Sequence, residues 1–318
     1  MIYIVIPNWN GKDHLKECYD SLYGQTYKDF VVVLVDNNSS DDSIAFTKAH
    51  YPDVKVLQLD TNRGFAGGVN EGIRFSLNFN PEYILLLNND IECKEDFLAE
   101  MLKGFKTEDT GSAACKMLNY YNRMKIDDAG DFIKKKGSPY ARGHAEIDQG
   151  QYNTEEFIFG PCAGAAIYRS KIFDEIGMFD EDFFAYYEDI DFSFRIQLAG
   201  YKCNYNPKAI CYHKRGATTE GNLGFQTRLC EKNLVALRLK NYPTGILLRY
   251  MPYFFVVRFK RYYGFFQMKS KKVFWSAVKG YFKGLSEIPK SLSKRKAIQK
   301  NMKVTPEYIE SLFTEGNQ

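Results

Sequence analysis

The first 118 residues predict an α/β fold built on a doubly wound, mostly parallel sheet. Short apolar runs rich in leucine or β-branched residues alternate with longer segments of helical character. Each run is apolar almost throughout, which is typical of strands buried on both faces of a parallel sheet. The predicted strands are Ile2–Ile6, Val31–Val35, Val54–Leu59 and Tyr83–Leu87. The predicted helices are Lys12–Tyr23, Asp41–Ala49, Ala66–Leu77 and Lys94–Phe105.

The rest of the chain predicts two further parts. Residues 119–158 are polar and rich in turn residues, which indicates a hairpin or loop excursion. A strand of small residues follows at 160–168, where glycines allow close approach of a ligand or tight packing of a helix. We therefore expect one large domain over residues 1–240 and a helical region over residues 241–318.

The composition is that of an ordinary globular protein, with 318 residues of which 45% are hydrophobic and 26% charged. Seven scattered cysteines without a CxxC spacing indicate neither a disulfide framework nor a zinc knuckle. The opening residues lack the basic segment and long apolar stretch of a signal peptide, so they predict a first strand. These features predict a protein of the reducing cytosol.

Polar residues follow three of the predicted strands. Open parallel sheets bind ligands at the carboxyl ends of their strands, so these residues are candidates for a binding site. They are Pro7-Asn8-Trp9-Asn10, Asp36-Asn37-Asn38 and Asn88-Asn89-Asp90. Asn and Asp also favour turns and helix caps, which is the alternative for each cluster taken singly. The Asp90 carboxylate, at the end of a rigid strand, has the oxygen chemistry that binds a hard divalent cation.

A glycine-rich segment at 62–72 places Arg63 and Gly64 at the start of a predicted helix, where backbone N–H groups favour a phosphate-bearing ligand. The segment lacks the GK[ST] ending of a Walker loop. No GxGxxG loop follows Ile6, which excludes the usual fingerprint of a nucleotide-dependent oxidoreductase.

The densest acidic cluster is Glu188-Asp189-Ile190-Asp191, which is surrounded by aromatic residues. Carboxylates near apolar walls acquire shifted pKa values suited to proton abstraction. The alternative is structural, with Asp189 as a helix cap and Asp191 paired with Arg195 at i,i+4. His213 ends a short apolar run beside two basic residues, where it can meet a metal or a diphosphate.

The order of these motifs resembles the inverting glycosyltransferases of family 2, which have the GT-A fold. The resemblance covers roughly residues 1–240 and rests on residues 4–10, 35–41, 62–65, 70–72, 88–90, 188–191 and His213. It implies a Rossmann-like, mostly parallel central sheet flanked by helices, with a C-terminal helical appendage. It also implies transfer of a sugar from a nucleotide-sugar donor to an acceptor hydroxyl, with Mg²⁺ or Mn²⁺ as cofactor. A catalytically silent sugar-binding scaffold is the alternative, and the presence of both Asp90 and Asp189 argues against it.

The resemblance also implies a role for each motif. Asp189 would be the catalytic base, Asp90 and His213 would hold the metal on the donor diphosphate, and Asp36 would recognise a pyrimidine base. The remaining donor-side residues are Pro7, Asn8, Asn10, Asn38, Arg63, Gly64, Asn88 and Asn89. Glu188, Asp191 and Gly164 would support the acceptor side.

Asn88 replaces the first Asp of the DxD motif, as in the rhamnosyltransferase-like branch, so Asp90 would be the motif's only carboxylate ligand. This branch favours dTDP-rhamnose as donor, with a UDP-sugar as alternative. Its acceptor would be a glycan or lipid-linked glycan in bacterial cell-surface polysaccharide synthesis. Neither Trp9 nor Trp275 lies in a QxxRW motif, so a single addition is favoured over polymerisation.

Charge is segregated along the chain. Residues 240–303 contain 16 Lys or Arg and one acidic residue, Glu287, although the net charge of the whole chain is only +4. The apolar stretch at 246–257 is interrupted by Arg249 and Pro252, so it is too short to span a bilayer. Interleaved bases and aromatics predict either amphipathic helices on an anionic membrane, here the inner face of the plasma membrane, or an appendage packed on the main domain. No RNA-binding or OB-fold pattern supports a nucleic-acid partner.

Overall fold

The computed structural model describes residues 1–318 except 137, 216–222, 268–269 and 316–318. Its centre is a ten-stranded sheet in the order β10-β12-β6-β11-β4-β1-β2-β3, with β5 and β7 added beside β12 and β6. The strands of this sheet are β1 (Ile2–Asn8), β2 (Phe30–Asp36), β3 (Lys55–Gln58), β4 (Tyr83–Leu87), β5 (Ile91–Cys93), β6 (Thr110–Asn119), β7 (Ile126–Asp128), β10 (Glu156–Ile158), β11 (Ala165–Arg169) and β12 (Lys202–His213).

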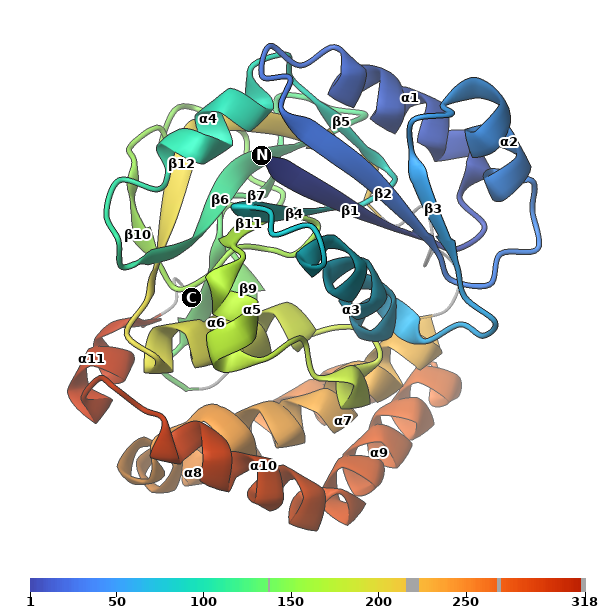
Figure 1. Cartoon of the computed structure of the whole chain (residues 1–318). Helices are drawn as coiled ribbons and strands as arrows, with labels where there is room; N and C mark the ends of the chain where they lie inside the picture. The colour runs from blue at the N-terminus through green and yellow to red at the C-terminus, as the bar shows by residue number, and fades with distance from the viewer. Residues whose placement is uncertain (137, 216–222, 268–269, 316–318) are drawn as a thin grey trace.

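The four strands predicted in the first half are confirmed, and they pair in parallel in the order β3-β2-β1-β4. Their register places Asn8 beside Asp36. On one face of the sheet pack α1 (Lys12–Tyr23), α2 (Ser43–His50) and α4 (Phe97–Lys103), and on the other pack α3 (Gly64–Leu77), α5 (Lys171–Ile176) and α6 (Glu188–Leu198). Helices on both faces of a mostly parallel sheet confirm the predicted α/β class (Figure 1).

Two predicted helices are shorter than expected. The helix predicted at Lys94–Phe105 covers only Phe97–Lys103, because Ile91–Cys93 first form β5 and pair with β12. The helix predicted from Asp41 begins at Ser43. The Asp41 carboxylate instead accepts hydrogen bonds from the Ser43 amide at 3.1 Å and from the Lys12 amide at 3.0 Å, so it ties the starts of α1 and α2 together.

Residues 119–158 form the predicted excursion of short strands and loops. Besides β7 and β10, it contains β8 (Asp131–Lys134) and β9 (Pro139–Ala141), which pair in antiparallel. The small-residue strand predicted at 160–168 is shorter, because residues 161–164 form a turn; the strand itself is β11, which lies antiparallel between β4 and β6. This reversal brings the excursion back to the carboxyl ends of the parallel strands.

The C-terminal region is helical, as predicted, and it packs along one side of the molecule (Figure 1). Its elements are α7 (Leu223–Asn241), α8 (Thr244–Gln267), α9 (Lys271–Ser286), α10 (Ile288–Lys300), α11 (Pro306–Ser311) and β13 (Phe313–Thr314), which pairs with β8. One apolar core joins α6 to α7, α8 and α11 through residues such as Phe194, Leu237, Tyr250 and Ile309. In the described part of the chain, no helix combines the length and apolar content that crossing a bilayer requires.

Candidate active site

The three polar strand ends meet, as the topology requires. Asn8 at the end of β1 donates to the Asp36 carboxylate at the end of β2 over 3.2 Å. Asn89, after β4, donates to the Asn8 side-chain oxygen over 2.7 Å. Pro7 lies within β1 opposite Val35, so the first cluster begins inside the strand. All three polar side chains are buried, which makes this row of hydrogen bonds a rigid floor at the edge of the sheet.

The turn after β2 is held from both sides. The Ser39 amide donates to Asp36 over 3.0 Å, and the Asn10 amide donates to the Ser39 hydroxyl over 2.9 Å. Asn10 and Asn38 both have positive φ, at 51° and 64°, a conformation that Asn tolerates better than most residues. Asp36 is fully buried, and a carboxylate with two such bonds keeps lone pairs for a further donor.

The start of α3 is fastened to the same edge by Asn37. The Asn37 side chain accepts from the Arg63 amide and donates to the Gly64 carbonyl, each over 2.8 Å. The Arg63 guanidinium contacts Glu71 at 2.7 Å, in a solvent-exposed ion pair. Gly64 has φ of 70°, and a Cβ there would meet the Phe184 carbonyl oxygen at 2.3 Å, so only glycine fits between the two loops.

A chain of charged side chains begins at Asp90. The Asp90 carboxylate lies 3.4 Å from Nε2 of His213, and Nδ1 of the same ring lies 2.7 Å from Asp127. Asp127 in turn contacts Arg215 at 2.6 Å. Burial alone lowers the pKa of His213, but Asp127 and Asp90 outweigh it and raise that pKa to about 9.

This chain has the form of a metal-ligand set. A histidine that ligates a metal usually gives its other ring nitrogen to a carboxylate, which fixes the tautomer and the ring orientation. Asp127 does this for His213 and leaves Nε2 facing the Asp90 oxygen. One carboxylate oxygen and one imidazole nitrogen fit Mn²⁺ or Mg²⁺ whose other ligands come from a diphosphate and water.

The predicted base, Asp189, lies in the first turn of α6. Its carboxylate accepts from the Ile190 amide over 2.8 Å and from the Ala163 amide over 3.4 Å. Burial raises the pKa of Asp189 above its ordinary value, while these amides and the positive charge of Arg215 act to lower it. Arg215 therefore links the base electrostatically to the Asp90–His213 pair.

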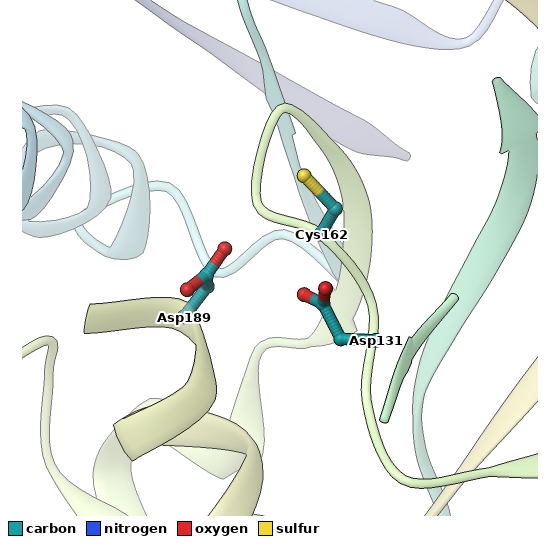
Figure 2. Close-up of side chains that lie close together, drawn as sticks. All are labelled: Asp131, Cys162 and Asp189. Carbon is teal, nitrogen blue, oxygen red and sulfur yellow. The ribbon is translucent and has the colours of Figure 1, made fainter. Parts of the chain in front are cut away.

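Asp189 faces a second acid across a small cluster (Figure 2). Single ligand-type atoms of Asp131, Cys162 and Asp189 all lie within 4.8 Å of one another. Burial raises the pKa of Asp131 well above its ordinary value, and burial raises that of the neighbouring Asp128 to about 7. One oxygen of each of these two carboxyls is buried without a hydrogen-bond partner in the described structure. A raised pKa favours the neutral form of both acids, and a neutral acid repels an ionised Asp189 less than a carboxylate does.

The two other acids of the 188–191 segment differ from Asp189 in their burial and their partners. Glu188 is buried, and burial raises its pKa well above the ordinary value. Asp191, in the first turn of α6, is fully buried and pairs with Arg195 at 3.1 Å and with Lys240 at 2.7 Å. The i,i+4 pair named as the structural alternative for Asp191 is therefore present.

The loop before Asp189 is strained. Phe184, Tyr186 and Tyr187 have φ values of 65°, 70° and 69°, which cost free energy for bulky residues and occur mainly where the surroundings enforce them. The enforcing group is Asn233 of α7, a fully buried side chain whose amide nitrogen lies 3.0, 2.9 and 2.7 Å from the carbonyl oxygens of residues 183, 185 and 186.

Gly164 lies against the acidic strand end. Its carbonyl accepts from the Asn88 amide over 2.8 Å, and a Cβ at Gly164 would come within 3.3 Å of the Asn88 side chain. The small residue thus allows the turn before β11 to approach the end of β4.

Several site residues escaped the sequence analysis. They are Asp127, Asp128, Asp131, Cys162, Arg215 and Asn233. The acids among them lie in the excursion that was assigned only as hairpin or loop, although three acids within five residues, 127–131, were a signal. Asn233 gives no local signal, because its role depends on α7 folding back over α6.

The fold is that of the GT-A class. The chain matches the model of Glycosyl transferase family 2 over residues 3–177, more than half of its length, and it belongs to that family. Among curated proteins, the low-salt glycan biosynthesis hexosyltransferase Agl10 of Haloferax volcanii is 27% identical over 203 residues, 60% of each chain. Poly-beta-1,6-N-acetyl-D-glucosamine synthase of Staphylococcus epidermidis is 23% identical over 215 residues, 66% of this chain and 49% of that protein. The chain thus spans only 49% to 60% of the length of these relatives.

Solved structures share the fold at low sequence identity. The mannosyltransferase PcManGT from Pyrobaculum calidifontis, solved with GDP-Man and Mn²⁺, has a TM-score of 0.53 at 15% identity, over 98% of this chain and 78% of that one. Residues 1–349 of S. aureus TarS in complex with UDP have a TM-score of 0.58 at 16% identity, over 98% and 89%. These likenesses confirm the predicted GT-A fold.

Proposed function

We propose that this protein is an inverting, metal-dependent hexosyltransferase that moves one sugar from a nucleotide-sugar donor to an acceptor hydroxyl. The observation that carries the proposal is the pairing of Asp90 with a His213 ring oriented by Asp127, together with the half-buried carboxylate of Asp189, to which Arg215 links them electrostatically. Asp90 and His213 would be the ligands of a cation on the donor diphosphate, and Asp189 would be the general base.

In the proposed step, Asp189 accepts the proton of the acceptor hydroxyl as the acceptor oxygen bonds to the anomeric carbon. The bond from that carbon to the diphosphate oxygen breaks, and the nucleoside diphosphate leaves from the opposite face. Asp90 and His213 would hold Mg²⁺ or Mn²⁺, which neutralises the charge that develops on the leaving group. Asn8, Asp36 and Asn89 would form the floor under the nucleoside, with Arg63 and Gly64 near the diphosphate.

For the donor we propose dTDP-rhamnose first, on the resemblance carried by Asn88-Asn89-Asp90, with UDP-hexoses and UDP-N-acetylhexosamines as the second class. The acceptor we propose is a glycan or lipid-linked glycan of a bacterial cell-surface polysaccharide, extended by one sugar per encounter in the cytoplasm. The relatives named for glycan and polysaccharide synthesis are consistent with an acceptor of this kind.

A donor screen tests the proposal. Thermal unfolding is measured with Mn²⁺ and each of dTDP-rhamnose, UDP-glucose, UDP-galactose, UDP-N-acetylglucosamine and GDP-mannose, because a ligand that binds only the native state raises its stability. Metal-dependent release of the nucleoside diphosphate from the stabilising donor is then followed. We expect a pyrimidine donor to stabilise the protein and to be slowly hydrolysed. Binding without hydrolysis or transfer would favour the scaffold alternative, and no stabilisation by any donor would contradict the proposal.

A further inference from the structure

Helix α8 has two apolar faces, and only one of them is used in the fold. Ile246, Leu247, Tyr250 and Phe254 are buried against α7 and its neighbours in the C-terminal core. A second set of large apolar side chains points away from that core and is exposed. We call it the α8 stripe, and it consists of Leu248, Phe255, Val256, Phe259, Tyr263 and Phe266.

The stripe is continuous along the helix. At about 100° per residue, its six members fall within an arc of about 100°, on the side opposite the buried set. Phe259 and Phe266 are 75% and 70% exposed, so neighbouring elements do not cover them. The stripe runs toward the corner between α8 and α9, where Phe266 contacts Phe274 and Phe274 contacts the exposed Trp275. An exposed apolar surface of this length marks an interaction site.

The charged residues of α8 and α9 themselves are all basic. Residues 244–286, which cover α8 and α9, contain nine Lys or Arg and no acidic residue. Part of this charge serves the fold, because Arg258 and Arg261 pair with Glu231 and Arg249 pairs with Glu310. Among the described residues, Lys260, Lys271, Lys272 and Lys279 are exposed and make no ion pair.

These charges decide which partner fits the stripe. A symmetric dimer through α8 and α9 would bring lysines together, and neither helix carries an acidic residue of its own to offset them, which disfavours it. An anionic leaflet offers both an apolar layer for the aromatic side chains and negative headgroups for the lysines. We propose that the α8 stripe and these four lysines seat the protein on an anionic membrane surface, with α8 lying in the interface.

A protein bound to the membrane through the α8 stripe would also be close to the lipid-linked acceptor of the proposed reaction, although the membrane proposal does not depend on that reaction. Helix α7 packs against α9 and carries Asn233, which holds the loop before Asp189. Helix α7 therefore connects α9, next to the proposed membrane surface, with the loop that precedes Asp189.

The test is sedimentation of the full chain with vesicles. The wild-type chain is mixed with vesicles of phosphatidylglycerol and phosphatidylcholine in equal parts, or of phosphatidylcholine alone, at low and high salt. We expect binding to the anionic vesicles only, weakening as salt rises. The triple variant Phe255→Ser, Phe259→Ser, Phe266→Ser should bind at least about tenfold more weakly, since each removed aromatic loses its transfer free energy. Point variants are used because removing residues 241–318 would expose the core shared with α6.

Two matched sets complete the test. Phe79→Ser, Tyr121→Ser and Phe157→Ser remove three exposed aromatics of the sheet domain and should leave vesicle binding unchanged. Lys260→Glu, Lys271→Glu, Lys272→Glu should abolish binding to anionic vesicles while leaving the melting temperature unchanged. The proposal is overturned if the wild-type chain stays in the supernatant, if the stripe variant sediments like wild type, or if light scattering finds a dimer that the stripe variant dissociates in the absence of vesicles.

Discussion

At the scale of single residues, Asp90 is the group whose loss should be most specific. It is buried at the end of β4, and its carboxylate faces Nε2 of His213. We expect Asp90→Ala to abolish Mn²⁺-dependent binding of the nucleoside diphosphate, because His213 alone would be left to hold the cation. Calorimetry with and without Mn²⁺ measures this. Glu92→Ala, two residues along and paired with Arg123, serves as the control and should bind like wild type.

Asp189 offers a test in which activity and stability move apart. Its pKa is raised by burial, so its ionised form is less stable in the folded protein than in water. Protonation of Asp189 therefore stabilises the folded protein. This stabilisation is complete below the pKa of Asp189 in the unfolded chain, about 4, and is lost as pH rises through its pKa in the folded protein. Asp189→Asn mimics the protonated form. It should lower the rate of sugar transfer by ~10²–10⁴ and leave the affinity for the donor unchanged. The melting temperature should stay the same or rise.

The pH dependence of transfer provides the companion measurement. Because only ionised Asp189 can accept a proton, the wild-type rate should fall on the acid side at a pH above that of an ordinary carboxyl. A normal rate in Asp189→Asn, or a rate that is flat down to about pH 4, would make Asp189 a structural cap.

At the scale of elements, α7 controls the conformation of the loop that leads into α6. The Asn233 amide nitrogen contacts three carbonyls there, and three bulky residues of the loop have positive φ. Asn233→Leu keeps the volume but removes the donor, so the loop should relax and misplace Asp189. We expect kcat to fall about 10- to 100-fold with little change in the KM for donor.

Asn206→Leu is the matched control for Asn233. Asn206 is a buried asparagine on β12 whose amide donates to the Glu100 carbonyl over 2.8 Å, on the α4 side of the sheet. Both substitutions should lower the free energy of unfolding by comparable amounts, because each leaves buried carbonyls without a donor. Only Asn233→Leu should lower kcat, and equal losses of kcat in both variants would contradict a positioning role for Asn233.

At the scale of the whole molecule, buried ion pairs join the C-terminal helices to the sheet domain. Lys240 of α7 contacts both Asp180 and Asp191, and Lys294 of α10 contacts both Asp180 and Asp182. Burial acts to raise the pKa of Asp180, but Lys240 and Lys294 outweigh it and hold that pKa well below its ordinary value. Part of the basic charge of the tail therefore neutralises acids of the main domain.

These ion pairs predict that the folded protein is less stable in acid and less stable when Asp180 is replaced. The folded-state pKa of Asp180 is depressed, so its contribution to stability is full above the unfolded-state pKa, about 4, and is lost as pH falls through the folded value. Asp180→Asn should lower the free energy of unfolding by about 1.5–3 kcal/mol at pH 7. In this variant Lys240 keeps its ion pair with Asp191. Urea unfolding measures this, and Asp29→Asn, whose exposed carboxylate pairs with the N-terminus, should change it by less than about 1 kcal/mol.

Local patterns determined the sheet, its flanking helices and the three polar strand ends. Continuous apolar runs bury on both faces, and parallel strands bring their carboxyl ends to one edge, so Asn8, Asp36 and Asp90 could be grouped from the sequence alone. The acidic cluster and the strand end also singled out Asp189 and His213, and the family resemblance added their roles. In the structure Asp189 accepts from the Ala163 amide, and His213 faces the Asp90 carboxylate.

Tertiary structure alone decided what supports these groups. Asp127 and Asp131 enter the site because residues 119–158 return to the strand ends, where Asp127 contacts His213 and Asp131 bridges Gly160; no local pattern specifies these contacts. Asn233 reaches the loop before Asp189 only because α7 packs on α6. The same packing divides the basic tail into cations that pair with buried acids and lysines that stay exposed. A sequence records the charge of a side chain, but its free energy depends on burial and neighbours, and only the folded chain provides those.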